Sequence, residues 1–97
     1  MDKREARSLL TRELERWRSG LYDDLALLVG RDPVTGEALG AHGDRYQFEI
    51  QVFWDDRPGG NLRVLGAVDD GGIRAFAPLT DDFIMAPDGS FVGEDSV

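Results

Sequence analysis

Carboxylates are the reactive side chains that this sequence holds in the largest number. Of its 97 residues, 19 are aspartate or glutamate, and eight of these form four adjacent aspartate pairs. Carboxylates of this kind bind Mg²⁺ or Ca²⁺ in some proteins and act as acid and base in some hydrolytic enzymes. The pairs are Asp23-Asp24, Asp55-Asp56, Asp69-Asp70 and Asp81-Asp82.

The spacing of these aspartates argues against a preformed cation site. Adjacent residues on a strand point to opposite faces, and no segment has the alternating ligands and terminal glutamate of an EF-hand. The strand arrangement predicted below places four of them at one end of the sheet, where they would form one weak cation site if they meet: Asp55, Asp56, Asp81 and Asp82. We otherwise interpret the pairs as solvated turn residues, and we expect no metal and no cofactor.

The one histidine, His42, is the second candidate for chemistry. Asp44 could orient it as a general base, but a nucleophile or a bound water would also be needed. The chain has no cysteine, so disulfides and thiolate metal sites are excluded, and it has no nucleophile-elbow, Walker or dinucleotide glycine motif. We interpret His42 as an exposed loop residue, and this inventory favours a protein that is not an enzyme.

A helix is predicted over residues 3–19, because apolar residues recur there at helical spacing before the stop signal Ser19-Gly20. For residues 21–29 a short second helix is favoured over a strand, since Asp23-Asp24 suits the first turn of a helix. Residues 30–45 are rich in glycine and are predicted as a long loop, which is one of two places where we expect a site.

Residues 46–79 predict an antiparallel meander of three strands. Large apolar residues alternate with polar ones from Tyr46 to Trp54, and the alternation resumes from Leu62 to Val68 after a glycine-rich turn. A third strand is predicted from Ile73 to Leu79. Pairing Trp54 with Leu62, Val68 with Ile73 and Leu62 with Leu79 places the alternating apolar residues of all three strands on one face.

The chain is therefore predicted to be one α+β domain over residues 1–97. One or two helices pack on one face of an antiparallel meander of three to five strands, and a closing hairpin covers residues 83–92. Small residues on the inner face, which are Gly66, Ala75 and Ala77, leave a shallow trough for the first helix.

The outer face of the meander is the better candidate for function. Apolar side chains mixed with arginine are typical of partner-binding surfaces. The alternative is that the long loop or the C-terminal hairpin folds over this face. The candidate partner-binding residues are Glu49, Gln51, Phe53, Arg63, Leu65, Arg74 and Phe76.

Charge is unevenly distributed along the chain, whose net charge is -8. Residues 1–20 have a net charge of +2 and the remainder a net charge of -10, and an acidic body repels nucleic acid. No apolar run approaches the roughly 18–20 residues needed to span a bilayer, and the first residues are charged where a signal peptide has its apolar core. We expect a cytoplasmic protein that binds neither nucleic acid nor membranes.

Two runs combine apolar residues with aspartate and glycine, from Tyr46 to Gly60 (YQFEIQVFWDDRPGG) and from Asp81 to Glu94 (DDFIMAPDGSFVGE). They resemble small uncharacterised bacterial domains known mainly from genome and structural-genomics surveys. The resemblance implies a bacterial origin, and it brings no catalytic motif with it. A basic set that is almost entirely arginine, with Lys3 as the one lysine, is compatible with a GC-rich genome.

Three functional hypotheses follow. The first is a protein-binding module that occludes a basic partner, by analogy with inhibitors and with the immunity proteins that neutralise toxins. The second is a small-ligand or divalent-cation-binding domain, or a carboxylate-dependent enzyme, that uses the aspartates named above or His42. The third is a structural subunit that self-associates into a homo-oligomer.

Overall fold

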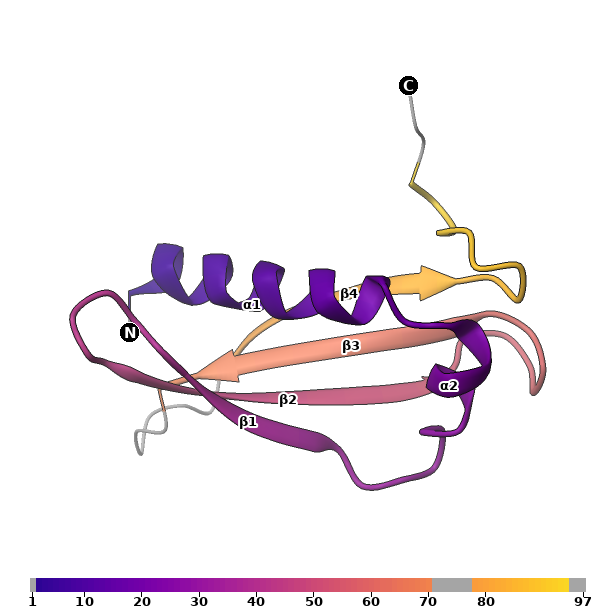
Figure 1. Ribbon diagram of the computed structural model, residues 1–97, viewed down its shortest axis with the longest axis horizontal. Coiled ribbons are helices and arrows are strands. Elements are labelled where there is room, and N and C mark those ends of the chain that lie inside the picture. Colours follow the sequence, from indigo (N-terminus) through magenta and orange to yellow (C-terminus); the bar gives the residue numbers. More distant parts are fainter. Residues whose placement is uncertain (1, 71–77, 95–97) are drawn as a thin grey trace.

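The computed structural model describes residues 2–70 and 78–94, in which two helices lie on one side of a four-stranded antiparallel sheet (Figure 1). The strand order in the sheet is β1-β2-β3-β4 and follows the sequence. The predicted α+β architecture is confirmed. The elements are α1 (Lys3–Arg18), α2 (Tyr22–Ala26), β1 (Val34–Leu39), β2 (Arg45–Trp54), β3 (Leu62–Asp69) and β4 (Leu79–Met85).

The N-terminal helix forms where the sequence predicts it. The Asp2 side chain caps its first turn by accepting a hydrogen bond from the Glu5 backbone N–H at 3.1 Å. Its apolar stripe of Ala6, Leu10 and Leu14 is buried against the sheet. The second helix is also confirmed as a helix, and it buries Leu25.

The centre of the sheet has the predicted pairing between β2 and β3. Trp54 lies opposite Leu62 and Phe48 opposite Val68, so the buried side chains of both strands share the face that α1 covers. Gly66 lies beneath the helix, where an added Cβ would be 2.8 Å from Leu10 Cδ1 and 3.1 Å from a Leu14 methyl. The predicted trough thus exists at Gly66, whereas its other two predicted members lie outside the described residues.

The third strand of the meander was predicted in the wrong place. Strand β4 puts Leu79 opposite Val68 and Met85 opposite Leu62, so Leu79 does not pair with Leu62. The interpretation of Asp81-Asp82 as turn residues is also wrong, because both lie within β4, an edge strand on which Asp81 is solvent-exposed and Phe83 is buried. Most of the predicted strand, residues 73–77, lies outside the described residues.

The prediction of a loop over residues 30–45 is also wrong, because it contains strand β1, which pairs with β2. The positions of β1 on the helix side include Gly36 and Ala38, which are too small to give a visible alternation of large apolar residues. A Cβ at Gly36 would overlap the Phe48 ring, which lies across this glycine. Strand β1 therefore lacks alternating large apolar residues, because the Phe48 side chain of the neighbouring strand β2 covers its inner face.

The predicted C-terminal hairpin forms as a tight turn on the helix side of the sheet (Figure 1). Its return segment pairs with β4 at a single position, Met85 opposite Phe91. Arg18 of α1 lies 4.8 Å from the centre of the Phe83 ring and 4.9 Å from that of Phe91, and it forms an ion pair with Glu94 at 2.7 Å. These contacts tie the hairpin to the end of α1.

Candidate functional site

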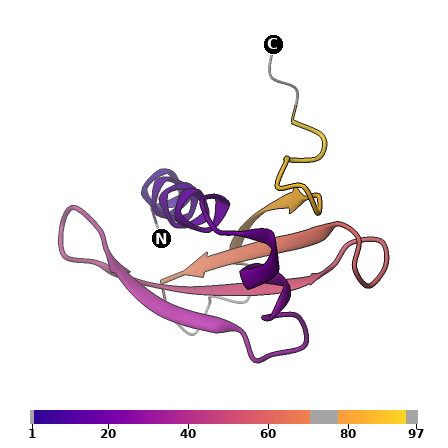
Figure 2. The same cartoon turned by 45° about the vertical axis from the view of Figure 1, so that its right-hand side comes forward.

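The outer face of the sheet is the surface opposite the helices. Both helices and the C-terminal hairpin lie on the inner face, and β1 extends the sheet sideways (Figure 2). The long segment and the hairpin were the two elements expected to cover the outer face. Within residues 2–70 and 78–94, neither of them covers it.

Apolar side chains form the middle of this outer face. Phe53 is 38% exposed, and Leu65 and Ile84 are half-buried on the neighbouring strands. The pairing places Phe53, Arg63 and Ile84 side by side across β2, β3 and β4. We call Phe53, Leu65 and Ile84 the outer apolar patch.

Arg63 joins two strands and a turn beside this patch. Its Nε and one terminal nitrogen donate to Asp55 Oδ1 at 3.0 and 2.7 Å, and its other terminal nitrogen donates to Asp82. The hydrogen bond to Asp55 is the main reason why the pKa of Arg63 is raised. The guanidinium is therefore held in place with both adjacent carboxylates satisfied.

The other predicted partner-binding residues divide into two groups. Glu49 and Gln51 are exposed on β2, on the predicted face, whereas Arg74 and Phe76 lie outside the described residues. Ile84 was missed, because the strand that carries it was not predicted. The even spacing of Leu79, Phe83 and Met85 on the other face of β4 was the signal for this strand, and Asp81 interrupts it.

The aspartates proposed as a weak cation site are engaged by the protein itself. Asp55 and Asp82 do come together, but the Arg63 side chain bridges them. Asp56 accepts hydrogen bonds from the backbone N–H groups of Arg57 and Asn61. These hydrogen bonds, mainly the one from Arg57, lower the pKa of the Asp56 carboxyl. Among the residues that the structure describes, no three histidine or acidic side chains are grouped to hold a metal ion.

His42 is exposed in the turn between β1 and β2, where Gly43 has a φ of +84°. Over the described ranges, no hydrogen bond joins its ring to Asp44 or to another side chain. Its position therefore adds nothing to the general-base hypothesis beyond the sequence spacing.

A polar contact on the inner side fixes α1 to the sheet. The Tyr46 hydroxyl donates a hydrogen bond to Glu5 at 2.8 Å, and the Ala41 N–H donates to the same carboxylate at 2.8 Å. Tyr46 is only 1% exposed. The hydrogen bond to Glu5, followed by burial and the negative charge of Glu5, raises the pKa of Tyr46 to about 12.

The raised pKa of Tyr46 predicts alkaline destabilisation. The folded state holds this proton more tightly than the unfolded state, whose tyrosine has a pKa near 10. The resulting stabilisation is complete below pH 10 and is lost as the pH rises from about 10 to about 12. Urea unfolding at several pH values should show a steeper loss over this range for the wild type than for Tyr46→Phe. Parallel losses would contradict the assignment.

Comparisons with known proteins do not place the chain in a family, since no family model, no curated protein and no solved structure matches it. No helix in the described part of the chain is long and apolar enough to cross a membrane.

Proposed function

We propose that this chain is a non-catalytic protein-binding module whose outer sheet face binds a basic partner protein. One observation supports the proposal above all others. The outer apolar patch lies on a sheet face that no described helix or loop covers, although the opposite face is packed in the usual two-layer manner. A sheet face of this kind needs no large apolar side chains unless something binds there.

The surroundings of the patch indicate the chemistry of the partner. The outward-facing positions of the four strands include four carboxylates (Glu37, Glu49, Asp69 and Asp82) and two arginines (Arg45 and Arg63). Arg63 is already paired with Asp55 and Asp82. Setting Asp69 aside, the remaining outward charges are Glu37 and Glu49 against Arg45, which leaves an excess of negative charge on the face. Apolar centres with charged rims are the usual anatomy of interfaces, and complementary charge speeds association.

The proposed module acts by occlusion, as inhibitors do. This mode of action requires a rigid complementary surface and no reacting side chain. Arg63 supplies rigidity here, because it ties β3 to β4 and to the turn that follows β2 through Asp82 and Asp55. Arginine beside an aromatic residue is a frequent energetic centre of such surfaces.

Substitutions in the patch test this proposal. The wild-type protein and a Phe53→Asp variant are used to capture partners from a lysate of the encoding organism, and the affinity of a purified captured protein is then measured by calorimetry. Loss of a central aromatic contact costs roughly 2 kcal/mol or more, so we expect at least about a 30-fold weaker Kd. We also expect the wild-type Kd to weaken as salt is raised.

Leu27→Asp is the matched control, because Leu27 is 69% exposed and lies just after α2, on the other side of the molecule. It should bind as the wild type does. A captured protein that binds Phe53→Asp and the wild type equally would contradict the proposal. A dimer of this chain in sedimentation, dissociated by Phe53→Asp, would instead support the self-association hypothesis.

A further inference from the structure

The two edges of the sheet differ in how their outward backbone groups are satisfied. Strand β4 forms one edge, and the chain itself supplies partners there. The Val92 N–H of the C-terminal hairpin donates to the Ile84 carbonyl at 2.9 Å. The Asp82 N–H donates to the side chain of Asp81 at 2.8 Å. These contacts protect much of the β4 edge from pairing with another strand.

Strand β1 forms the other edge, and its outward backbone groups are open. The Gly40 N–H donates to the Asp44 carbonyl at 2.8 Å, where the ladder between β1 and β2 ends. Because hydrogen-bonded positions alternate along an antiparallel pair, the backbone groups of Thr35, Glu37 and Leu39 point away from β2. In the described part of the chain no strand pairs with them. Strand β1 also lacks the proline, the bulge and the several charges that usually protect an edge.

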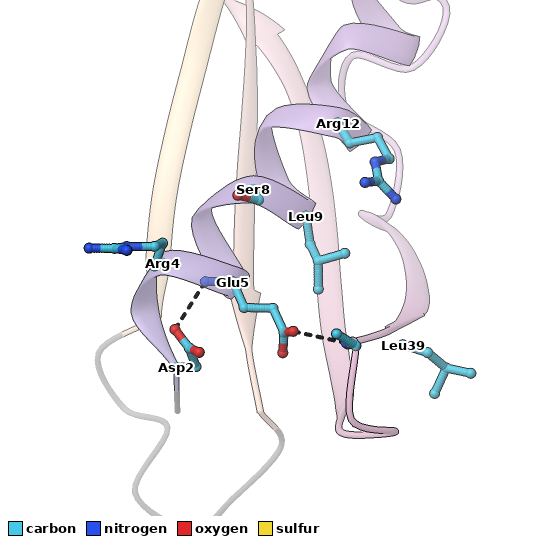
Figure 3. Close-up of a pocket in the computed structure, with 9 residues that line it drawn as sticks. Asp2, Arg4, Glu5, Ser8, Leu9, Arg12 and Leu39 are labelled. Carbon is cyan, nitrogen blue, oxygen red and sulfur yellow. Dashed lines mark hydrogen bonds between the residues drawn. The ribbon is translucent and has the colours of Figure 1, made fainter.

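Apolar residues lie on both sides of this open edge. Val34, Gly36 and Ala38 lie on the inner side, which α1 leaves open because it packs on β3 and β4 (Figure 2). Val34 is 38% exposed there. On the outer side Leu39 is 67% exposed, and its side chain is directed away from α1 (Figure 3). An edge with open backbone groups and exposed apolar side chains is suited to pairing with a further strand.

We propose that a second copy of this chain pairs with β1 as an antiparallel strand, about a two-fold axis at Gly36. Two-fold pairing brings the same surface of each copy together and joins the two sheets into one continuous sheet. Both sets of helices then lie on one side and both outer faces on the other, so the dimer presents two outer apolar patches. This inference goes beyond the proposed function and rests on different residues.

The side chains of β1 suit pairing about this axis. With the axis perpendicular to the sheet at Gly36, Val34 lies opposite Ala38 of the second copy on the inner side. On the outer side Thr35 lies opposite Glu37 of the second copy, where the hydroxyl can donate to the carboxylate. An axis at Glu37 would instead place two like charges directly opposite each other, which destabilises a strand pair. The sequence of β1 therefore favours the axis at Gly36.

The Phe48 ring favours a second copy over an unrelated strand. In each copy this ring lies over Gly36 of the same chain, on the inner side of the edge. At the axis the two Gly36 residues form a non-hydrogen-bonded pair, whose Cα atoms lie about 4.5 Å apart. The two rings are thereby brought within the distance at which aromatic side chains contact each other. An unrelated strand has no built-in counterpart for this ring.

The first test is the salt dependence of sedimentation equilibrium. A net charge of -8 on each copy opposes association, so the dimer Kd should fall as salt is raised. This direction is opposite to the one expected for a basic partner on the outer face. At about 0.1 mM protein in about 0.5 M salt we expect mainly dimer, which corresponds to a Kd of roughly 50 μM or below. A monomer under these conditions would overturn the proposal.

Proline variants locate the contact. Glu37→Pro removes an outward N–H but no hydrogen bond to β2, so we expect the dimer Kd to rise at least about tenfold. Thr80→Pro is the matched control, because Thr80 is exposed on the other edge strand and its backbone points outward like that of Ile84. Thr80→Pro and the outer-face variant Phe53→Asp should both dimerise as the wild type does. An equal loss of dimer in Thr80→Pro or in Phe53→Asp would overturn the proposal.

Disulfide formation tests the register with the fold intact, since the chain has no cysteine of its own and both substituted positions are exposed. Thr35 and Glu37 of the second copy would form a hydrogen-bonded pair, whose Cα atoms lie about 5.5 Å apart, within reach of a disulfide. A mixture of Thr35→Cys and Glu37→Cys should therefore form a linked dimer faster than either variant alone. Linking of the mixture that is no faster than linking of the single variants would overturn the proposal.

Discussion

Replacing Gly66 with valine is expected to lower the free energy of unfolding by about 3 kcal/mol. Even the first carbon of the new side chain would lie 2.8 Å from Leu10 and 3.1 Å from Leu14, so α1 would have to move away from β3. The direction of the effect is informative, because valine is otherwise favoured over glycine in a strand. Urea denaturation followed by tryptophan fluorescence measures it.

Ala67→Val is the matched control for this prediction. Ala67 is the next residue of β3 and faces the outer side of the sheet, where it is half-buried. The added methyl groups should change the free energy of unfolding by less than about 0.5 kcal/mol. If Gly66→Val is as stable as Ala67→Val, then α1 does not pack on β3 as described.

Replacing Leu10 with alanine is expected to cost about 3 kcal/mol, because it removes a buried side chain from the contact between α1 and the sheet. Leu21→Ala is the control, since Leu21 is 70% exposed and should change the free energy by only a few tenths of a kcal/mol. Equal stability of the two variants would contradict the described core.

The same two positions predict an interaction in a double mutant. Leu10→Ala empties the space that the valine side chain in Gly66→Val would occupy. The combined cost should therefore be smaller than the sum of the single costs by roughly 1 kcal/mol, as contacting residues commonly show. Additive costs would indicate that the two residues do not touch.

The centre of the sheet could be predicted from sequence because its two strands are buried strongly on one face. The inward-facing residues of the two strands recur at every second position, and four of them are almost fully buried: Tyr46, Ile50, Leu62 and Val64. A slip of one residue in the pairing would have exposed them all. The same regularity correctly placed Phe53, Arg63 and Leu65 on the outer face.

The edge strands could not be predicted in the same way, because an edge strand buries less and tolerates polar residues. The sequence from Leu79 to Met85 contains two aspartates, which are unfavourable in a strand. Asp82 is accommodated in β4 because it forms an ion pair with Arg63 of the neighbouring strand, and the sequence alone does not reveal this contact. Strand β1 depends on Gly36, whose role is evident only with Phe48 lying over it. Both cases involve a contact between residues distant in sequence.

The candidate site was predictable in part for the same reason. Phe53 and Leu65 of the outer apolar patch lie on the two strands whose pairing was predicted. Ile84 was missed, because it lies on the edge strand β4.

The strand order, identical to the order along the chain, has a consequence for how the protein folds. Each pair of adjacent strands is joined by one connection, so the hairpins can form early from contacts that are local in sequence. Helix α1 instead packs on β3 and β4, which follow it in the chain. A free helix of 16 residues is only marginally stable in water. Although α1 is synthesised before these two strands, it should therefore become stable only once they are in place, and its docking should be a late step in the folding of the sheet.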